Sequence, residues 1–418
     1  MKQQQLIVIG GGAAGFFTAV NAARTNPDLK VTILEKSGKL LSKVRVSGGG
    51  RCNVTHACFD IDEMIKRYPR GLHFVRKAFH HFFTTDTISW FKERGVELKT
   101  EADGRMFPVT DTSETIIACL LREADKYKVD IKMNVDVKKI IVNDVTTDEK
   151  KFGIYLSETT ILHADFICVA CGGYSKATQF DWLKQWGHTI AEPAPSLFTF
   201  NMPGNNITAL MGVSVDKASV KIKGTKFSQQ GPLLITHWGM SGPAILKLSA
   251  WAARELQHGG YHFTIIINWL HSFTEQTLRE EWPVLRQQYA AQKMSSRNPF
   301  QLPARLWEYL LTCSGIQPEQ WWSDLQAKQQ NVLIHNLTTQ EFEVKGKTTF
   351  KEEFVTCGGI NLSEIDVNTM QSKKHGGLFF AGEVLDVDGI TGGFNFQHAW
   401  TSGWIAAKGI AEKMTEVV

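Results

Sequence analysis

The stretch Leu6-Ile7-Val8-Ile9-Gly10-Gly11-Gly12-Ala13-Ala14-Gly15 decides the fold of this chain. Its four apolar residues predict a buried strand, and the helical spacing of the apolar residues that follow predicts a helix opening at the turn. Glycines at 10, 12 and 15 fit the pattern G-x-G-x-x-G, which lets backbone approach a diphosphate closely. The N-terminus of the helix would favour phosphate through its free N–H groups and dipole. We therefore expect a dinucleotide site whose contacts include Gly10, Gly12, Ala13, Ala14 and Gly15.

A second predicted strand, residues 30–35, ends in the acid Glu35. This acid follows the glycine turn by about 20 residues, the spacing at which a carboxylate reaches the ribose hydroxyls of a bound adenosine. A glycine-rich turn without a ligand is the alternative. The order of strand, turn, helix, strand and acid favours the cofactor site.

The composition indicates a large globular enzyme. The chain has 418 residues, of which 43% are hydrophobic and 21% charged, with a net charge of +4. Such a chain can bury a sizeable core in two or three domains. The weak net charge does not favour nucleic acid or an acidic membrane surface, so we expect a small-molecule substrate and neither of those partners. Nothing in the sequence indicates an oligomeric state.

Seven cysteines form neither a metal pattern nor a disulfide framework. Cys168 and Cys171 are spaced C-x-x-C, but they lie in an apolar run that predicts a buried strand, and no second pair follows. We therefore expect no metal site. The odd number of cysteines favours a reducing compartment, and the early start of the first strand leaves no room for a signal peptide. Both observations predict a cytoplasmic protein.

Residues 37–53 predict a long basic loop that is rich in glycine. Backbone N–H groups at Ser47, Gly48, Gly49 and Gly50 are suited to bind a ligand ring or a phosphate. A solvated loop is the alternative. Because this loop follows a nucleotide motif, we interpret it as a second clamp on the cofactor.

The C-terminal block carries the second strong signal. Residues 377–383 predict a buried strand that ends in Gly382 and Glu383, and residues 392–395 open a helix. In flavin sites such an acid binds the ribityl or ribose chain, and the helix dipole stabilises the negative edge of reduced flavin. Two distant segments around one long cofactor favour FAD over NAD.

Two further contacts are expected at the same edge of the sheet. The predicted strand 166–170 stops in a pair of glycines, which should bring Ala170 and Gly172 to the crevice where the cofactor crosses. Val137 is expected to contact the adenine through its backbone.

A cluster of prolines around residues 192–203 interrupts the pattern of strands and helices and predicts a domain boundary. We expect residues 1–192 and 353–418 to form the two parts of a cofactor domain, and residues 193–352 to form an α+β insert. His237 lies in the sharpest motif of this insert and is a candidate acid or base. A structural histidine held by hydrogen bonds is the alternative.

Five segments together resemble the bacterial YhiN/BaiN-like, or aminoacetone-oxidase-like, NAD(P)/FAD-dependent flavoprotein family over essentially the whole chain. They are GGGAAGF, KVRVSGGGRCNVTH, LLITHWGMSGPA, TCGGI and EIDVNTMQSKKHGGLFFAGEVLDVDGITGGFNFQHAWTSGWIAA. The resemblance implies an α/β fold in which a glutathione-reductase-type FAD-binding Rossmann domain is interrupted by an α+β insert, a small β-barrel plus a helical piece. One departure is Ala170-Cys171-Gly172-Gly173, where relatives tend to have A-T-G-G.

The resemblance also places the flavin contacts. They are Gly10, Gly12, Ala13, Ala14, Gly15, Glu35, Lys36, Lys43, Ser47, Gly48, Gly49, Gly50, Arg51, Cys52, Asn53, Gly382, Glu383, Gly393, Phe394 and Asn395.

The expected function is that of an FAD-dependent oxidoreductase that exchanges hydride or electrons with a small organic substrate. The resemblance implies oxidation of an amine or amino acid, or reduction of a conjugated C=C bond, with NAD(P)H as a transient co-substrate. The alternative is a flavin-bearing partner protein in a complex such as one for RNA modification, with a mainly structural cofactor. His237, His398 and Cys52, each beside a motif, are the catalytic candidates, and for each a structural role is the alternative.

Overall fold

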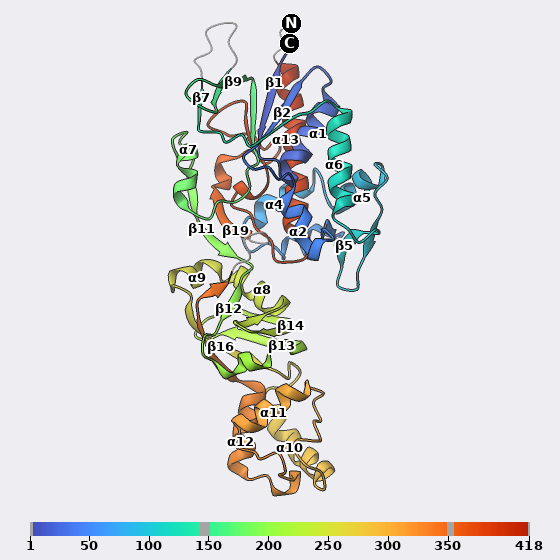
Figure 1. Ribbon diagram of the computed structural model, residues 1–418, viewed down its shortest axis with the longest axis vertical. Coiled ribbons are helices and arrows are strands. Elements are labelled where there is room, and N and C mark those ends of the chain that lie inside the picture. The colour runs from blue at the N-terminus through green and yellow to red at the C-terminus, as the bar shows by residue number, and fades with distance from the viewer. Residues whose placement is uncertain (1–2, 143–150, 349–354, 417–418) are drawn as a thin grey trace. The chain divides into compact units, whose positions relative to one another are not determined.

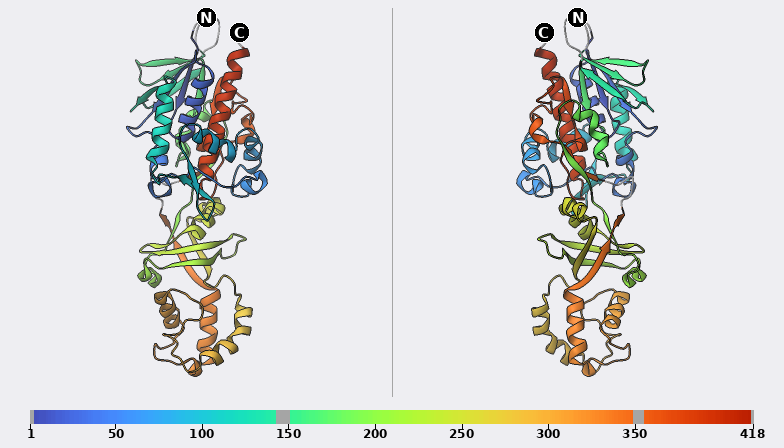
Figure 2. Two further views of the ribbon diagram at one scale, coloured as in Figure 1. Left: turned by 90° about the vertical axis from the view of Figure 1, so that its right-hand side faces the viewer. Right: turned by 90° about the vertical axis from the view of Figure 1, so that its left-hand side faces the viewer.

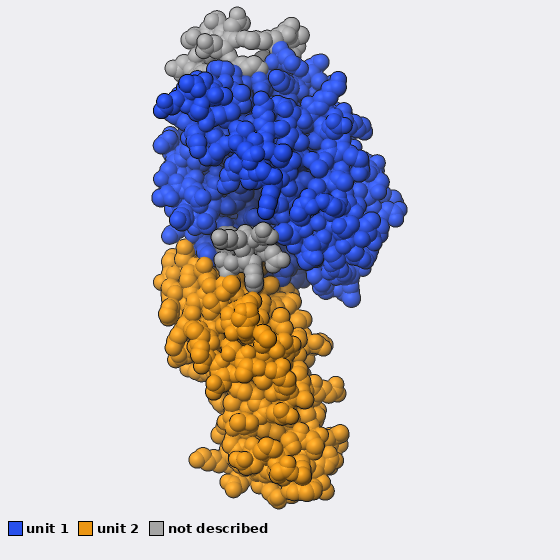
Figure 3. Space-filling model, in the orientation of Figure 1, with its two compact units in different colours: residues 1–195, 351–418 blue, residues 196–350 orange. Residues whose placement is uncertain are grey.

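A computed structural model of the chain describes residues 3–142, 151–348 and 355–416. The chain divides into two compact units, residues 1–195 with 351–418 and residues 196–350 (Figures 1 and 3). The predicted domain boundary at 352/353 lies outside the described residues.

The core of the first unit is a five-stranded parallel sheet with the strand order β20-β10-β1-β2-β6. Its strands are Leu378–Phe380, Phe166–Val169, Gln5–Ile9, Lys30–Glu35 and Asp130–Met133. The central strands are almost fully buried, as expected for a parallel sheet covered by helices. The predicted strand before the glycine turn and the predicted strand ending at Glu35 are both confirmed.

Helix α1 (Ala13–Thr25) packs against α13 (Phe394–Glu416) and α6 (Glu114–Lys126). Figures 1 and 2 show α1 and α13 side by side, although one begins near the start of the chain and the other near its end. The helix predicted to open after Gly393 is therefore confirmed, and it covers the same sheet as the first helix.

The turn between β1 and α1 depends on its glycines. Gly10 has φ +113°, and a Cβ there would lie 2.3 Å from the carbonyl oxygen of Ala170. A Cβ at Gly15 would lie 2.0 Å from the carbonyl oxygen of Gly10. Both contacts are with backbone, which cannot move aside, so the two glycines are required by close packing.

Smaller elements complete the first unit. Three antiparallel strands, β7, β8 and β9, span Lys139–Val142, Phe152–Tyr155 and Ile161–Ala164. A second small sheet, β3-β5-β4, comprises Thr55–His56, Arg105–Pro108 and Leu98–Thr100. A two-stranded sheet pairs β11 (Ile190–Ser196) with β19 (Val355–Ile360). Further helices of this unit include α3 (Ile61–Ile65), α4 (Leu72–Phe79), α5 (Thr84–Lys92) and α7 (Asp181–Lys184).

The prediction of an uninterrupted loop over residues 37–53 is wrong. Helix α2 spans Ser42–Gly50. The side chain of Val44, in its first turn, is fully buried and anchors that turn. The helical geometry breaks at Ser47, Gly48 and Gly49, where the two glycines have φ of +60° and +69°. The segment is ordered around the buried side chains of Leu41 and Val44, although its glycines and charges predict a loop.

The second unit contains a seven-stranded antiparallel sheet with the order β17-β16-β13-β14-β15-β12-β18. Its strands are Gln340–Lys345, His262–Asn268, Ser214–Ile222, Ser228–Thr236, Gly239–Ser241, Thr199–Asn201 and Lys347–Thr348. Helix α8 (Pro243–Trp251) packs against the sheet, and α9 (Ala253–His258) contacts α8. The α+β composition predicted for this region is confirmed.

A helical piece completes the second unit, with α10 (Glu275–Tyr289), α11 (Ala304–Cys313) and α12 (Ala327–Thr338). Trp282, Trp307 and Trp322 are buried within it and belong to one apolar core shared with the sheet. These three tryptophans therefore serve packing. Within the described part of the chain, no helix combines the length and apolar character needed to cross a membrane.

Candidate cofactor site

Residues from the two ends of the chain meet at the carboxyl edge of the parallel sheet. Gly382, which follows β20, lies against α1, because a Cβ at this glycine would be 2.8 Å from Cβ of Ala14. Its N–H donates to Oγ of Ser402 on α13 at 2.9 Å. The glycine turn of the first motif and the strand end of the last motif thus share one location.

Glu383 bridges two segments at this edge. Its Oε2 accepts from Nζ of Lys43 at 2.5 Å, and its Oε1 accepts from the N–H of Thr356 at 2.8 Å. The side chain of Glu383 is 18% exposed, so a ligand can still reach it. This placement of Lys43 beside Glu383 is consistent with both lying along a bound ribityl chain.

Glu35 is fixed at the other end of the site. Its Oε2 accepts from the N–H of Gly11 at 2.8 Å, and its Oε1 accepts from the N–H and hydroxyl of Ser37 at 2.8 and 2.7 Å. The carboxylate is therefore held next to the glycine turn, where an adenosine ribose would lie. The ammonium of Lys36, the next residue, lies 5.9 Å from the ring centre of Tyr174.

The first turn of α1 faces space that a cofactor can occupy. A Cβ at Gly12 would meet no described atom within 4 Å, and the same holds at Gly49, Gly50 and Gly172. No described side chain caps the N-terminus of α1. Its first N–H groups are thus available to an anion, which fits the diphosphate of a dinucleotide.

Asn53 connects the glycine-rich segment to the N-terminus of α13. With its amide oriented to satisfy both neighbours, Asn53 donates to the carbonyl of Thr55 at 3.0 Å and accepts from the N–H of Gly393 at 2.9 Å. Gly393 has φ +93°, and a Cβ there would lie 2.5 Å from the same Thr55 carbonyl. The structure therefore brings together segments 47–53 and 392–395, both of which were predicted to contact the flavin.

The loop before α13 is closed by the side chain of Asn395. Its Oδ1 accepts from the N–H of Gly389 and its Nδ2 donates to the carbonyl of Gly389, both at 2.8 Å. The hydroxyl of Tyr68 donates to the carbonyl of Phe394 at 2.6 Å. Because the Asn395 side chain is engaged at both ends, a flavin contact at this position falls to its backbone N–H.

Two members of the segment 47–53 face the protein instead of a ligand. The guanidinium of Arg51 lies 4.0 Å from the ring centre of Phe107 and pairs with Glu101 at 2.6 Å. Cys52 is fully buried with φ +62°, and burial raises the pKa of its thiol to about 12. Cys52 is thus a protonated thiol at neutral pH, in a position that is closed to solvent.

His398 lies in the second turn of α13 and is almost fully buried. Within the described residues, neither ring nitrogen has a hydrogen-bond partner, and burial lowers the pKa of the ring to about 4. The imidazole is therefore neutral at pH 7. A buried polar group without a partner is costly and points to a hydrogen bond supplied by a water or a bound ligand.

The remaining predicted residues lie in three other segments of the chain. His237 is exposed in the second unit, between β14 and β15, with its ring 4.2 Å from that of Trp238. Val137 is half-buried between β6 and β7, in a segment tied to the end of β2 by the N–H of Val135, which donates to the carbonyl of Glu35 at 2.9 Å. Ala170 lies against Gly10 at the end of β10. His398 and Cys52 thus belong to the first unit, and His237 belongs to the second.

All seven cysteines lie within the described residues, and none of them forms a disulfide bond. Cys168 is buried on β10, with its Sγ 3.8 Å from Oγ1 of Thr18. Among the described residues, no group of three or more histidines, cysteines or carboxylates could hold a metal ion.

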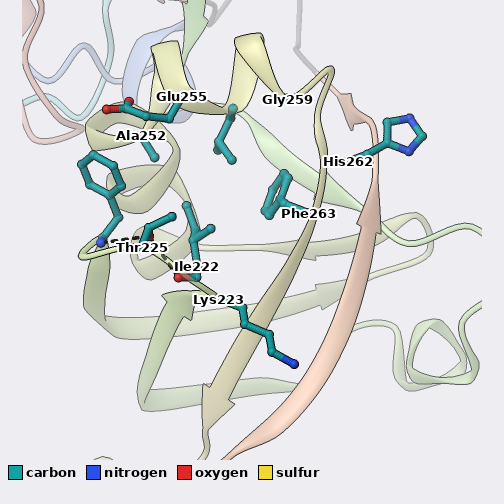
Figure 4. Close-up of a pocket in the computed structure, with 10 residues that line it drawn as sticks. Ile222, Lys223, Thr225, Ala252, Glu255, Gly259, His262 and Phe263 are labelled. Carbon is teal, nitrogen blue, oxygen red and sulfur yellow. Dashed lines mark hydrogen bonds between the residues drawn. The ribbon is translucent and has the colours of Figure 1, made fainter.

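A pocket of about 150 Å³ lies wholly within the second unit (Figure 4). Its walls are largely apolar and include Phe227, Leu256 and Phe263. Figure 4 shows Phe263 pointing inward, while Lys223 and His262 point away from the hollow. This pocket therefore offers few polar groups to orient a substrate.

Sequence reasoning missed the residues that hold the site together. Tyr68 binds a carbonyl 326 positions away, and Thr356 binds a carboxylate 27 positions away. Tyr68 lies in no glycine-rich or acidic motif, so the sequence gives no signal for its role. Thr356 opens the segment TCGGI, but its hydrogen bond to Glu383 is a tertiary contact that no motif reveals.

At the carboxyl edge of the sheet, the glycine turn 10–15 meets segments 382–383 and 393–395 from the other end of the chain, and we call this arrangement the two-ended cradle. The Rossmann-type parallel sheet and this cradle define the class of protein, a flavin-binding α/β oxidoreductase. The chain belongs to the HI0933-like flavoprotein family, because the family model described as HI0933-like protein Rossmann domain matches residues 4–409. The resemblance to the YhiN/BaiN-like family is thereby confirmed, as is the prediction of a flavoprotein oxidoreductase.

Curated relatives cover nearly the whole chain. The chain is 30% identical over 98% of both lengths to the ribosomal RNA dihydrouridine synthase of Escherichia coli K12. It is 26% identical to the 3-dehydro-bile acid delta(4,6)-reductase of Clostridium scindens, over 97% of this chain and 98% of that protein. The family thus contains flavin-dependent reductases.

Solved structures support the fold. The 3-ketosteroid Δ4-(5α)-dehydrogenase of Rhodococcus jostii RHA1 matches with a TM-score of 0.50 and 13% identity over 97% of both chains. The 3-ketosteroid Δ1-dehydrogenase of Sterolibacterium denitrificans matches with a TM-score of 0.52 and 12% identity over 98% of this chain and 99% of that chain. At such low identity these similarities show the α/β flavoprotein fold alone.

The prediction that nucleic acid is not a partner is wrong. It is contradicted by relatives in Escherichia coli and Haemophilus influenzae, each 30% identical to this chain, that are named for action on ribosomal RNA. The prediction was based on a net charge of +4 for the whole chain. Net charge averages over the surface, whereas contact with phosphates depends on local groups of basic side chains.

Proposed function

We propose that this protein is an FAD-dependent reductase of the uracil ring in ribosomal RNA, forming dihydrouridine. The observation that carries the proposal is 30% identity, over 98% of both chains, to a ribosomal RNA dihydrouridine synthase. The two-ended cradle supports it, because the chemistry needs a bound flavin and the residues of the cradle fit one.

The reaction is a reduction of a C=C bond conjugated with a carbonyl group. Hydride adds to the ring carbon farther from the C4 carbonyl and a proton adds to the carbon next to it, so the double bond becomes a single bond. Bound FAD, once reduced by NAD(P)H as a transient co-substrate, would supply the hydride, and the proton would come from solvent. The protein must bind and orient both reactants.

The chain's own residues are assigned as follows. Backbone N–H groups of Ala13 and Ala14 at the N-terminus of α1 would bind the diphosphate, and Glu35 would bind the adenosine ribose. Glu383 would accept from the ribityl hydroxyls. The N-terminus of α13, held by Asn53, would direct its positive dipole end at the pyrimidine edge of the flavin and stabilise negative charge there.

The same assignment includes two finer points of architecture. We propose that the first unit is an FAD domain of the glutathione-reductase type, with boundaries at 192/193 and 352/353. We propose that the antiparallel sheet of the second unit forms a small β-barrel. A ribosomal RNA substrate also favours a cytoplasmic location.

A second candidate substrate is a steroid-like enone. It is favoured by 26% identity over nearly the whole chain to a bile acid reductase. The chemistry is equivalent, because an enone also has a C=C bond conjugated with a carbonyl group.

One assay distinguishes the two substrates. Purified holoenzyme with NADPH is incubated in one reaction with bacterial ribosomal RNA transcribed in vitro, and in a parallel reaction with a 4-en-3-oxo steroid. Nucleoside mass spectrometry of the digested RNA should show dihydrouridine, and the steroid should be unchanged. A reduced steroid with unmodified RNA would support the second candidate, and failure of both would refute the reductase assignment.

A further inference from the structure

One face of the hairpin formed by β13 and β14 is basic. Along β13, Ala218, Val220 and Ile222 alternate into the core and are at most 3% exposed. The alternate positions Lys217 and Lys221 are exposed on the opposite face, because side chains of a strand alternate between faces. Lys226, in the turn of the hairpin, is exposed as well.

These three lysines have no carboxylate at ion-pair distance among the residues that the structure describes. The acidic side chains nearest along the sheet are Asp216 on β13 and Glu341 and Glu343 on β17. Glu341 pairs with Lys223 at 2.7 Å, and Glu343 pairs with Lys345 at 3.0 Å. Asp216 is then the one carboxylate of the hairpin, against Lys217, Lys221 and Lys226, so the hairpin keeps a net positive charge.

Around Lys221 this face is polar, whereas Leu234, at the far end of β14, is 37% exposed. Ser219 lies opposite Gln230, and Lys221 lies opposite Ser228, in the register of the hairpin. Hydroxyl and amide side chains of this kind commonly accompany lysine in contacts with a sugar–phosphate backbone. A face that binds a lipid surface would instead carry large apolar side chains to insert between the headgroups.

We propose that the outer face of the β13–β14 hairpin, with Lys217, Lys221 and Lys226, binds the phosphate backbone of the RNA substrate. The proposal rests on the proposed function for the class of its ligand. It assigns RNA contact to the second unit, in a region where the sequence shows no nucleotide motif.

The test measures RNA affinity of the full-length holoenzyme as a function of salt. The variant carries Lys217→Gln, Lys221→Gln and Lys226→Gln. The matched control carries Lys30→Gln, Lys77→Gln and Lys92→Gln, which remove the same charge from exposed lysines of the first unit. The probe is bacterial ribosomal RNA transcribed in vitro, and reduction of the flavin by NADPH is followed as a check on the cofactor site.

The hairpin variant should bind RNA at least about tenfold more weakly at physiological salt. In a plot of log affinity against log salt concentration, the magnitude of its slope should be smaller by about 2, because each lost phosphate contact removes about 0.7 to 0.9. Flavin reduction should be unchanged in both variants. Equal affinity for the hairpin variant and wild type, or an equal loss in the control, would overturn the proposal. Preference of the wild type for phosphatidylglycerol vesicles over RNA would overturn it too.

The two proposals fail in different ways. If the wild type forms no dihydrouridine but its RNA affinity depends on the hairpin, the proposed reaction is wrong and the RNA surface stands. If the wild type forms dihydrouridine and the hairpin variant binds and modifies RNA as well as wild type does, the reaction stands and this surface is wrong.

Discussion

Helices α1 and α13 both begin directly after a pair of glycines, yet their N-termini are built differently. The first belongs to a continuous strand–turn–helix unit, in which Gly10 and Gly15 pack against nearby backbone and Gly12 faces open space. The second is held by side chains from distant segments, namely Asn53 and Tyr68, together with its own Asn395.

This difference separates local from assembled sites. Most determinants of the N-terminus of α1 lie in its own strand, turn and helix, and the contacts of Gly10 with Ala170 and of Gly11 with Glu35 add to them from other strands of the same sheet. The N-terminus of α13 exists only when segments near residues 53, 68 and 394 have come together. A flavin that bridges both would therefore link the two ends of the chain energetically.

The largest effect is expected at Gly15. Gly15→Ala should lower the free energy of unfolding by about 3 kcal/mol, because its Cβ would lie 2.0 Å from the carbonyl oxygen of Gly10. Gly12→Ala is the matched control for folding, since nothing described lies within 4 Å of its Cβ. Urea unfolding of the cofactor-free proteins should show the loss for Gly15→Ala alone. Equal stability of the two variants would mean that the turn is not built as described.

The next effect is on the pH dependence of stability and concerns α13. Burial lowers the pKa of His398 to about 4, while in the unfolded chain it has its ordinary value. The unfolded chain therefore binds the proton first, so stability is full above about pH 6.5 and falls by about 3 kcal/mol as the pH drops to 4.

His398→Phe should flatten this part of the pH profile, because phenylalanine does not titrate. His237→Phe, at an exposed position, is the control for the substitution itself. Unfolding free energies measured between pH 7 and 4 decide the point. An unchanged profile in His398→Phe would show that His398 does not carry the pH dependence.

A smaller effect is expected from the clamp that precedes α13. Asn395→Ala removes both hydrogen bonds to Gly389, which should cost about 2 kcal/mol of stability and weaken flavin binding. Asn361→Ala, which removes an exposed cap of a short helix elsewhere in the same unit, serves as the control for flavin affinity. If Asn395→Ala binds flavin as tightly as the control does, the shape of this loop is irrelevant to the site.

The smallest effect is expected at Lys43. Its pair with Glu383 is partly exposed, so Lys43→Met should change stability by less than about 1 kcal/mol. Flavin affinity should nevertheless change, because Glu383 loses the partner that orients it. Thermal unfolding and flavin titration of the same variant separate the two. A large loss of stability without any change in affinity would assign this pair to folding alone.

The comparison also shows what could be predicted from the sequence. The strand at Leu6–Ile9, the glycine turn and Glu35 obey local rules of periodicity and spacing, and the structure confirms them. Helix α2 was missed because its order depends on burial of Val44, which no local pattern reveals. Tyr68 was missed because its hydroxyl donates to a carbonyl 326 positions away, a tertiary contact that no local pattern reveals.

The partner class was mispredicted because composition was used for a question of local geometry. The net charge of +4 conceals an exposed group of lysines on one hairpin of the second unit. Strand alternation at 217–222 is visible in the sequence, but the missing carboxylate partners are visible only in the folded sheet.

The central claim is that both ends of the chain bind a single FAD. Titration of FAD into the cofactor-free protein, followed by flavin fluorescence, tests it with wild type and two variants, Gly12→Ala and Gly393→Ala. The account predicts one FAD per chain for wild type and at least about tenfold weaker binding for each variant, since one fills the space at α1 and the other displaces Thr55 from the start of α13. A wild-type chain that takes up no flavin, or a Gly393→Ala variant that binds FAD as wild type does, would contradict it.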